Sequence, residues 1–443
     1  MKKFCKLALL LMVTAVMLLS VVSCKKDDGP QPVSGLSTNN EYGLPEYKLG
    51  DNKTVKIVSF NASINSELFQ SFYGGTVEVD VAPQDQVRQK FINLVLANTP
   101  PDLVTQMFSP LLANKDIVVP MNDLIDFSTE LWAGVKETLD NYAYKEKYYA
   151  VPVNYGRSWC LFYNNEIFEE FGHKTPWEYL QEDNWTWDTL RSTAKDLTVD
   201  SDKDGKPDIW GCSNDSEHQS FLISTGKGFV YLDKNGTPVN DIKSERVARA
   251  MKVFVDFRTV DGSFGGSRND FAQGKVAMLQ TAYWTGGSYF QEMLDADILR
   301  VVPNPRDPQA DKFYIDTDTY TYTMAKKAPN PTGVAAFMCA LRKDNIIDLE
   351  EMLDESIPAA DKIWGDTVAG QQLRDFLTNT KYVGVEPYWG IFNGTAYWPQ
   401  YWTDSLETPW ATIAENLHPV IQENLESAFN EVLESVPLES QEE

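Results

Sequence analysis

The stretch TVKIVSF, residues 54–60, alternates apolar and polar side chains, which predicts a β-strand. A second alternating stretch, TVEVDV, follows at 76–81 after a predicted helix and the Gly74-Gly75 turn, and apolar residues at helical spacing occupy 84–98. The segment PPDLV at 100–104 stops that helix and begins another strand. Strand, helix, strand, helix and strand in this order indicate an α/β lobe with a mostly parallel sheet.

The length of 443 residues suits two lobes of ordinary size. Further helices are predicted where apolar residues recur every three to four positions, at 187–197, 244–258, 331–341 and 411–436. Trp185 and Trp187 flank Thr186, which is expected to cap the helix that follows, so both indoles are read as structural.

The first 23 residues have the composition of a secretory signal peptide. Three lysines precede an apolar run from Leu7 to Val22, and Ser23-Cys24 ends it. A cysteine directly after the cut is typical of a bacterial lipoprotein, so Cys24 is the expected lipidation site. The alternative is a retained transmembrane helix, but the run is shorter than the roughly 20 residues that a bilayer core requires. Residues 24–52 lack apolar periodicity and predict a flexible tether.

The net charge of −25 falls to −28 once the three lysines of residues 1–23 are removed. Such a charge disfavours nucleic acid, anionic lipid and anionic ligands, although an acidic surface also serves solubility. Of the five cysteines, Cys160 and Cys339 lie in apolar runs and are read as buried. The spacing of Cys160, Cys212 and Cys339 fits neither a disulfide framework nor a metal site.

Four segments, in this order along the chain, resemble the extracellular solute-binding lipoproteins of ABC sugar importers. They are LANTPPDLV at 96–104; YAVPVNY at 149–155 leading into LFYNNEIF at 161–168; FAQGKVAM at 271–278 with the trailing Tyr283-Trp284; and YTMAK at 322–326 through Asn330-Pro331. Residues 98–100 depart from the small residue and glycine usual before Pro-Asp in that family, and 345–410 match nothing in it.

The resemblance implies an α/β, two-lobed, periplasmic-binding-protein-like fold, with a mostly parallel sheet in each lobe and hinge crossings between them. Residues 53–156 with about 319–385 would form the first lobe, and 157–318 with about 386–443 the second. The implied protein is a monomeric, non-enzymatic receptor outside the cytoplasm, held to the membrane by its lipid. Its expected partners are a sugar or oligosaccharide and ABC permease subunits, with no required cofactor.

Candidate ligand contacts are aromatic and polar residues near the predicted cleft. Sugars present apolar ring faces and polar edges, so such a site needs aromatic plates and hydrogen-bonding groups. Trp284 follows a strand-like run and precedes Gly286-Gly287, which indicates a loop at a strand's carboxyl end. The other candidates are Tyr283; Tyr155, Arg157 and Trp159 in the first crossing; Asn61 and Phe108 after first-lobe strands; and Trp389 in an aromatic loop. Arg157 has a hinge salt bridge as its alternative, and Trp389 a cap packed on the core.

Residues 200–208 carry acids at alternate positions with glycine at the sixth, which is the spacing of a calcium loop. Asp200, Asp202, Asp204 and Asp208 are the candidate ligands of a structural calcium ion. The twelfth position is Gly211 rather than glutamate, so the alternative is a self-bonded Asp/Gly turn.

Two other functional classes compete with a receptor. A glycoside-acting hydrolase would need only two carboxylates about 5–9 Å apart, and 64 acidic residues allow such a pair. A passive surface or adhesion lipoprotein is the third class. Metalloprotease, nucleotide-binding and serine-hydrolase motifs are not found in the sequence.

Overall fold

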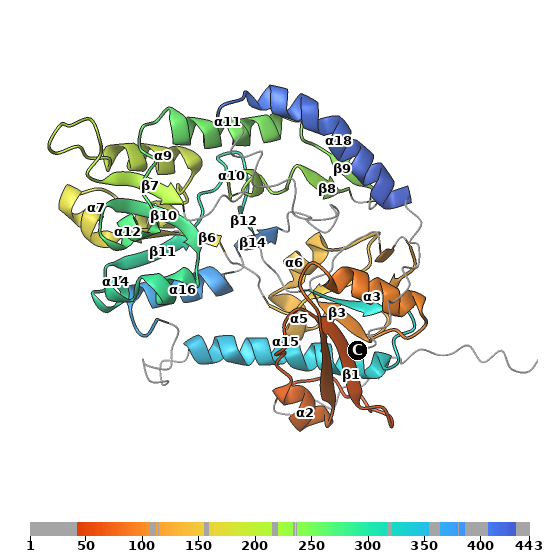
Figure 1. Cartoon of the computed structure of the whole chain (residues 1–443). Helices are drawn as coiled ribbons and strands as arrows, with labels where there is room; N and C mark the ends of the chain where they lie inside the picture. The colour runs from red at the N-terminus through yellow and green to blue at the C-terminus, as the bar shows by residue number, and fades with distance from the viewer. Residues whose placement is uncertain are drawn as a thin grey trace, which may run out of the picture.

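The computed structural model describes residues 42–105, 112–113, 115–154, 159–214, 220–233, 235, 237–316, 321–353, 364–379, 381–385 and 406–430. These residues form two lobes, each built on one β-sheet covered by helices (Figure 1). Buried side chains of the second lobe form one hydrophobic cluster, whereas the first lobe has a cluster on each face of its sheet. The two-lobed α/β fold expected from the sequence is confirmed.

The first lobe has a six-stranded sheet in the order β2-β1-β3-β13-β4, with β5 also paired to β13. Its strands are β1 (Thr54–Ser59), β2 (Thr76–Val81), β3 (Leu103–Thr105), β4 (Val118–Val119), β5 (Ala150–Pro152) and β13 (Thr321–Ala325). Its helices are α2 (Glu67–Tyr73), α3 (Val87–Leu96), α5 (Glu130–Ala133), α6 (Lys136–Asn141) and α15 (Pro331–Leu353). Along β1, Ile57 and Val58 enter opposite cores, as successive strand residues must.

The second lobe has a four-stranded sheet in the order β11-β6-β10-β7. Its strands are β6 (Trp159–Asn164), β7 (Trp210–Asn214), β10 (Val276–Ala282) and β11 (Leu299–Pro303). Its helices are α7 (Asn165–Phe171), α8 (Pro176–Gln181), α9 (Trp187–Asp196), α10 (Ser220–Ile223), α11 (Glu245–Thr259), α12 (Arg268–Ala272), α13 (Thr285–Tyr289), α14 (Gln291–Asp295), α16 (Val368–Thr378) and α18 (Trp410–Asn430). Two small sheets pair β8 (Val230–Leu232) with β9 (Pro238–Asn240) and β12 (Phe313–Asp316) with β14 (Tyr382–Val385).

One strand in each main sheet runs against the others. In the first lobe β13 is antiparallel to β3, β4 and β5, while β1 is parallel to β2 and β3. In the second lobe β6 is antiparallel to β10 and β11, while β10 is parallel to β7. The reversed strands lie in the two segments expected to cross between lobes. Both sheets are therefore mostly parallel in strand direction, as predicted.

Helix α15 is longer than the predicted 331–341 and extends from the first lobe toward the second (Figure 1). Its continuation contains Arg342, which is 1% exposed and donates to the carbonyl oxygens of Leu131 and Val153, each at 3.0 Å. A charged residue in the core interrupts the apolar pattern, which explains why the sequence-based boundary was too early.

Helix α16 packs against β11, and its buried Leu373 and Phe376 belong to the hydrophobic cluster of the second lobe. The sequence-based division had assigned residues up to about 385 to the first lobe. The difference arises because 345–410 contain no motif that marks where the chain changes lobes. Helix α18 lies along α11 and β9 on the second lobe (Figure 1).

Asp102 in the Pro-Pro-Asp segment joins three elements of the first lobe. It is 1% exposed, and its carboxylate accepts the backbone N–H groups of Lys56 on β1 at 2.9 Å and Asn330 before α15 at 2.6 Å. Burial raises the pKa of Asp102, and these two hydrogen bonds oppose that rise. The motif that resembles the solute-binding family therefore has a structural role here.

Cys160 and Cys339 are buried free thiols, which confirms their reading as small core residues, and Cys212 is a third buried free thiol. Burial raises the pKa of the Cys339 thiol to about 12.

Trp185 and Trp187 are also buried, at 0% and 2% exposure, and their indole N–H groups donate to Pro303 O and Ser224 Oγ. From residue 42 onward, none of the helices in the described ranges is both long and apolar enough to cross a bilayer.

Candidate ligand-binding site

An aromatic cluster lies where β10 ends and β6 begins. Every residue of β10 is buried, and Tyr283 and Trp284 follow it directly. Trp159 starts β6 and lies opposite Ala282, the last residue of β10. The ring centroids of Trp159 and Trp284 are 6.2 Å apart, and those of Tyr283 and Trp284 are 5.6 Å apart. Trp284 remains 47% exposed, so much of its indole is open to a ligand.

The position of Trp284 depends on the short helix α13 that follows it. The sequence analysis expected a loop around Gly286-Gly287, but the structure has a helical turn there. A Cβ at Gly286 would lie 2.2 Å from a ring carbon of Trp364, so glycine is required by close packing. Thr285 Oγ1 also donates to the Ala282 carbonyl oxygen at 2.8 Å and anchors the turn to the strand.

Tyr283 is less accessible than Trp284. Its side chain is partly buried against the second-lobe core, and burial raises the pKa of its hydroxyl. Its ring therefore supports the indole of Trp284 from the side of the core. Among the predicted aromatic residues in the described ranges, Trp284 has both Trp159 and Tyr283 as ring neighbours at the sheet edge.

A polar network that the sequence analysis missed lies at the same sheet edge. Gln280 of β10 is 3% exposed, and its Nε2 donates to Asn304 Oδ1 at 3.1 Å. Asn304 follows β11 and donates through Nδ2 to Ser220 Oγ at 3.0 Å. The carboxyl ends of β10 and β11 meet here because these strands run in the same direction. The available signal was Gln280 itself, a polar residue in the apolar run VAMLQTA.

The first lobe contributes hydroxyl and amide groups at the carboxyl ends of β1 and β3. Ser59 ends β1, and its Oγ accepts the Thr105 hydroxyl at 2.9 Å and the Asn61 backbone N–H at 2.9 Å. The Asn61 side chain is exposed beyond this bridge. Asn61 thus occupies the predicted edge of its sheet, whereas Ser59 and Thr105 are additional polar groups there.

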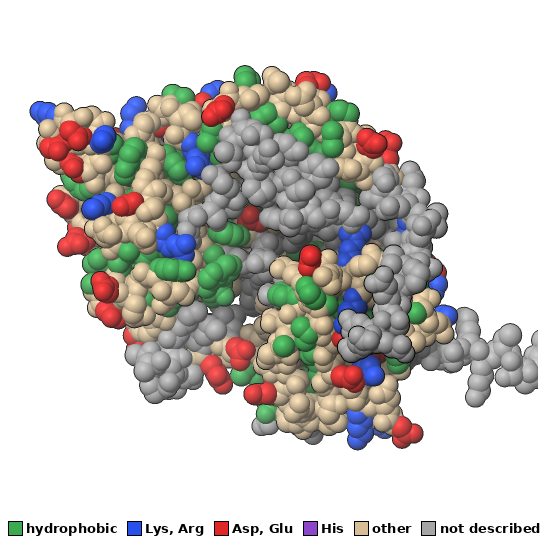
Figure 2. Space-filling view, in the orientation of Figure 1, with side chains coloured by type: hydrophobic (Ala, Val, Ile, Leu, Met, Phe, Trp, Pro, Cys, Tyr) green, Lys and Arg blue, Asp and Glu red, His purple; other side chains and the backbone are tan. Residues whose placement is uncertain are grey.

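Several predicted residues lie outside the described ranges. They are Cys24, Phe108, Tyr155, Arg157 and Trp389. The space-filling view shows a hollow between the two lobes on the face drawn (Figure 2). The aromatic pair and the polar network belong to the second-lobe side of the predicted site, and Asn61 to the first-lobe side.

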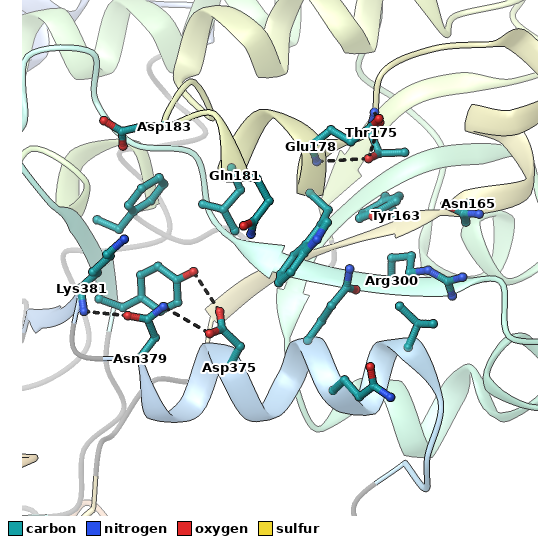
Figure 3. Close-up of a pocket in the computed structure, with 17 residues that line it drawn as sticks. Tyr163, Asn165, Thr175, Glu178, Gln181, Asp183, Arg300, Asp375, Asn379 and Lys381 are labelled. Atoms are coloured by element: carbon teal, nitrogen blue, oxygen red, sulfur yellow. Dashed lines mark hydrogen bonds between the residues drawn. The ribbon is translucent and has the colours of Figure 1, made fainter. Parts of the chain in front are cut away.

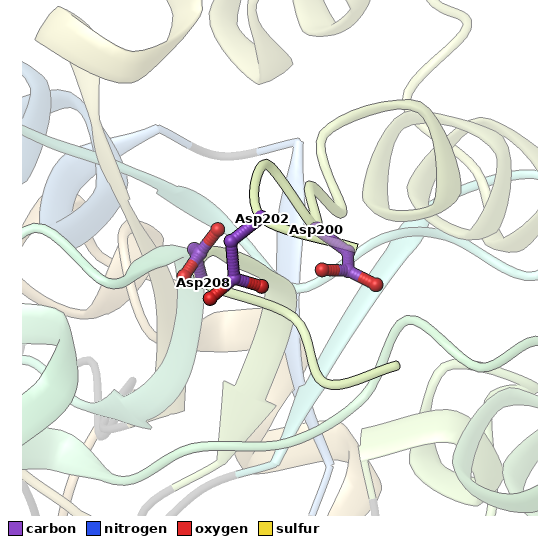
Figure 4. A group of neighbouring side chains, drawn as sticks. All are labelled: Asp200, Asp202 and Asp208. Atoms are coloured by element: carbon purple, nitrogen blue, oxygen red, sulfur yellow. The ribbon is translucent and has the colours of Figure 1, made fainter. Parts of the chain in front are cut away.

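Three of the four acids in the predicted calcium loop come together (Figure 4). One carboxylate oxygen from each of Asp200, Asp202 and Asp208 lies within 4.8 Å of the others. Asp200 Oδ2 accepts the Gly205 N–H at 3.0 Å, whereas its buried Oδ1 has no hydrogen-bond partner among the described residues. Gly205 has φ +87°, the left-handed conformation needed at the sixth position.

Asp204 does not belong to this group. Its Oδ1 accepts the Lys206 N–H at 2.8 Å and closes a local turn. Similar bonds join Asp202 to the Asp204 N–H and Asp208 to the Ser201 N–H, so the loop also has the features of a self-bonded turn. Three converging carboxylates with an unpartnered oxygen fit a hard cation that prefers oxygen ligands.

Comparisons with solved structures agree with the two-lobed architecture. An ABC substrate-binding protein from Listeria monocytogenes, solved with cycloalternan, has a TM-score of 0.56 at 15% identity, over 85% of this chain and 100% of its own. A cyclic α-maltosyl-1,6-maltose binding protein from Arthrobacter globiformis has a TM-score of 0.55 at 13% identity, over 86% and 99%. The GacH receptor of Streptomyces glaucescens, solved unliganded and with acarbose, has a TM-score of 0.52 at 17% identity, over 84% and 98%.

A comparison with curated proteins gives no match. The model of the family described as bacterial extracellular solute-binding proteins matches residues 52–343, about two thirds of the sequence. This match covers both main sheets and both crossing strands. The chain therefore belongs to the family of bacterial extracellular solute-binding proteins.

Proposed function

We propose that this protein is a lipid-anchored receptor outside the cytoplasm, which binds a neutral sugar or oligosaccharide between its lobes. It would deliver that solute, as a monomer, to the permease of an ABC transporter. Family membership supports solute capture, and the ligands named for the similar structures favour carbohydrate. The observation that carries the proposal is the half-exposed Trp284 beside Trp159 at the carboxyl edge of the second-lobe sheet.

The chemistry of these residues matches a carbohydrate. An exposed indole offers an apolar plate for the C–H face of a sugar ring, and nearby amide and hydroxyl groups suit its hydroxyls. Asn61 is exposed at the first-lobe edge, whereas Ser59, Thr105, Gln280 and Asn304 are buried and hydrogen-bonded within the protein, so they support the edges from beneath. Since these groups are uncharged and the chain is strongly acidic, a neutral ligand is favoured over an anion.

Binding of maltotriose, raffinose, mannitol and cycloalternan by isothermal titration tests the proposal. For a saccharide that binds, Trp284→Ala should weaken affinity by at least fivefold, since aromatic contacts contribute about 1 kcal/mol. Phe171→Ala is the matched control, because Phe171 is 37% exposed at the end of α7, which follows the opposite end of β6. Equal affinity in wild type and Trp284→Ala would remove this residue from the site.

The same titrations separate a receptor from the hydrolase alternative. After prolonged incubation with the protein, the saccharide should be recovered intact by chromatography. A receptor would raise the melting temperature without turnover, because a ligand that binds only the folded state stabilises it. Release of shorter saccharides would contradict the non-enzymatic assignment.

Lipid attachment at Cys24 is a separate part of the proposal. The support is the sequence of the first 24 residues, with basic, apolar and small-residue segments in order. Expression in a bacterium fed with labelled palmitate should give a labelled protein in the membrane fraction. Cys24→Ala should lose both the label and the membrane association, whereas Cys160→Ala should lose neither.

We also propose that Asp200, Asp202 and Asp208 bind calcium. The support is their converging oxygens and the unpartnered Asp200 Oδ1. At a calcium concentration about five times Kd, binding should add about 1 kcal/mol to the free energy of unfolding. Asp200→Asn should abolish this gain, and Asp204→Asn is the matched control because Asp204 lies outside the converging group. If calcium does not raise the free energy of unfolding of the wild type, or if magnesium raises it equally, the self-bonded turn explains the loop.

A further inference from the structure

A cavity of about 730 Å³ lies in the second lobe between α8, α16 and the edge strand β11 (Figure 3). It is separate from the aromatic pair of the proposed cleft. Asn165, which lines the cavity, directly follows β6, whereas Trp159 begins that strand. Six residues of extended chain span roughly 20 Å, so the two places are at opposite ends of the strand.

Aromatic side chains form part of the cavity lining. Trp177 from α8, Tyr382 from β14 and Phe313 from β12 all border it. Trp177 is partly buried, because it packs against the second-lobe core and also borders the cavity. A ring held in this way is a rigid apolar surface whose position costs little conformational entropy on binding.

The cavity lining also carries an ordered set of polar groups. Asp375 accepts the Asn379 side-chain amide at 3.2 Å and the Tyr382 hydroxyl at 3.3 Å, and Asn379 Oδ1 accepts the Lys381 backbone N–H at 3.0 Å (Figure 3). Gln181 on α8 and Gln371 on α16 are exposed at the cavity, as is Lys381. Hydrogen-bonding groups therefore border the cavity from two helices and from the start of β14.

Most charged groups of the lining have partners within the protein. Glu178 closes the capping box of α8 with Thr175, Arg300 donates to the Asp297 carbonyl oxygen at 2.7 Å, and Asp183 lies 3.5 Å from Arg306. The rest of the lining includes aromatic faces and neutral amides, and the acids Glu178, Asp183 and Asp375 outnumber the bases Arg300 and Lys381. This combination fits a neutral polyhydroxyl compound better than an anion, and the volume is within the usual range for small-molecule sites.

We propose that this cavity is a second carbohydrate site, independent of the cleft between the lobes. A short neutral saccharide would stack on Trp177 and form hydrogen bonds with Gln181, Gln371 and Asn379. The inference does not require the proposed receptor function, because it rests on the lining of one lobe alone. It predicts one saccharide molecule per chain in this cavity, in addition to any solute bound in the cleft.

Isothermal titration of maltose, maltotriose, raffinose and mannitol into the purified protein tests this inference. For at least one probe, binding should persist in Trp284→Ala, which affects the cleft, and should fall at least tenfold when Trp177→Ala is added. Gln181→Ala should weaken the same site at least threefold, and because Gln181 is exposed this change spares the fold. Trp177→Phe, which retains a ring, should keep most of the affinity.

Different outcomes separate this proposal from the receptor function. Suppose that Trp284→Ala abolishes all binding, whereas Trp177→Ala and Gln181→Ala keep wild-type affinity. This result would overturn the second site and support the cleft. Absence of a second site for all four probes up to about 10 mM, where binding free energies are only about 3 kcal/mol, would also overturn it. Binding that is sensitive only to Trp177 and Gln181 would support the cavity and contradict the cleft.

Discussion

Asp344 is a buried carboxylate whose replacement gives a sharp test of the first-lobe packing. It lies on α15, is 6% exposed, and accepts the backbone N–H of Leu68 in the first turn of α2. Ser66, the N-cap residue of α2, makes no side-chain cap hydrogen bond, so Asp344 performs that role from another helix. Its Oδ2 has no hydrogen-bond partner among the described residues.

Burial raises the pKa of Asp344 from 3.8 to about 6, and the charges of Asp348 and Glu67 add to the rise. A raised pKa means that the folded state binds the proton more tightly than the unfolded chain does. The ionised form therefore lowers stability as pH rises from about 4 to 6, and the full penalty persists above pH 6. Two pKa units correspond to about 3 kcal/mol, and partial solvation reduces the expected effect to about 1–2 kcal/mol.

Asp344→Asn removes this charge and keeps an oxygen that can accept the Leu68 N–H. Urea unfolding should show the variant about 1–2 kcal/mol more stable than wild type at pH 7.5, with the difference disappearing near pH 4. Glu351→Gln, an exposed position on the same helix, controls for the change in net charge. A less stable variant at pH 7.5, or a difference that does not vary with pH, would refute the reasoning.

Three further substitutions test packing elsewhere. Gly286→Ala should destabilise the second lobe by about 1–3 kcal/mol because its Cβ would overlap the Trp364 ring, and Trp364→Leu in the same chain should recover part of that loss in urea unfolding. Arg342→Met should lower the free energy of unfolding by about 2–4 kcal/mol, because the Leu131 and Val153 carbonyl oxygens lose the Arg342 donor. A decrease below about 1 kcal/mol would contradict this expectation. Trp185→Phe removes the hydrogen bond to the Pro303 carbonyl oxygen, so the free energy of unfolding should fall by about 1–2 kcal/mol, whereas solute affinity should stay constant.

The sequence predicted the local elements well because their signals are local. Alternation predicted β1 and β2, and helical spacing predicted α3, α9, α11 and the start of α18 to within a few residues; the predicted end of that last helix lies outside the described residues. The two reversed strands, β6 and β13, could not be identified from alternation, since strand direction depends on which neighbours a strand pairs with. The lobe to which α16 belongs was also missed, because it depends on which distant segment the helix packs against.

The candidate site divides in a similar way. Trp284 was predicted from its place after an apolar strand, and Asn61 from its place after β1. Gln280, Asn304 and Ser220 are distant in the sequence, so their hydrogen-bonded network was invisible without the fold. The Asp-rich loop was recognised as a unit, but only the tertiary structure separates Asp204 from the three acids that converge.

By itself, the sequence determined the acidic character of the chain, the succession of strands and helices, and the aromatic residues that follow β10. These depend on residue type and on spacing over a few positions, where the backbone geometry leaves few choices. Tertiary structure alone decided the glycine required beneath Trp364, the cap that Asp344 gives to α2, and the cavity between α8 and α16. Each of these arises where segments far apart in the chain come within contact distance, and packing over such separations has no local signature.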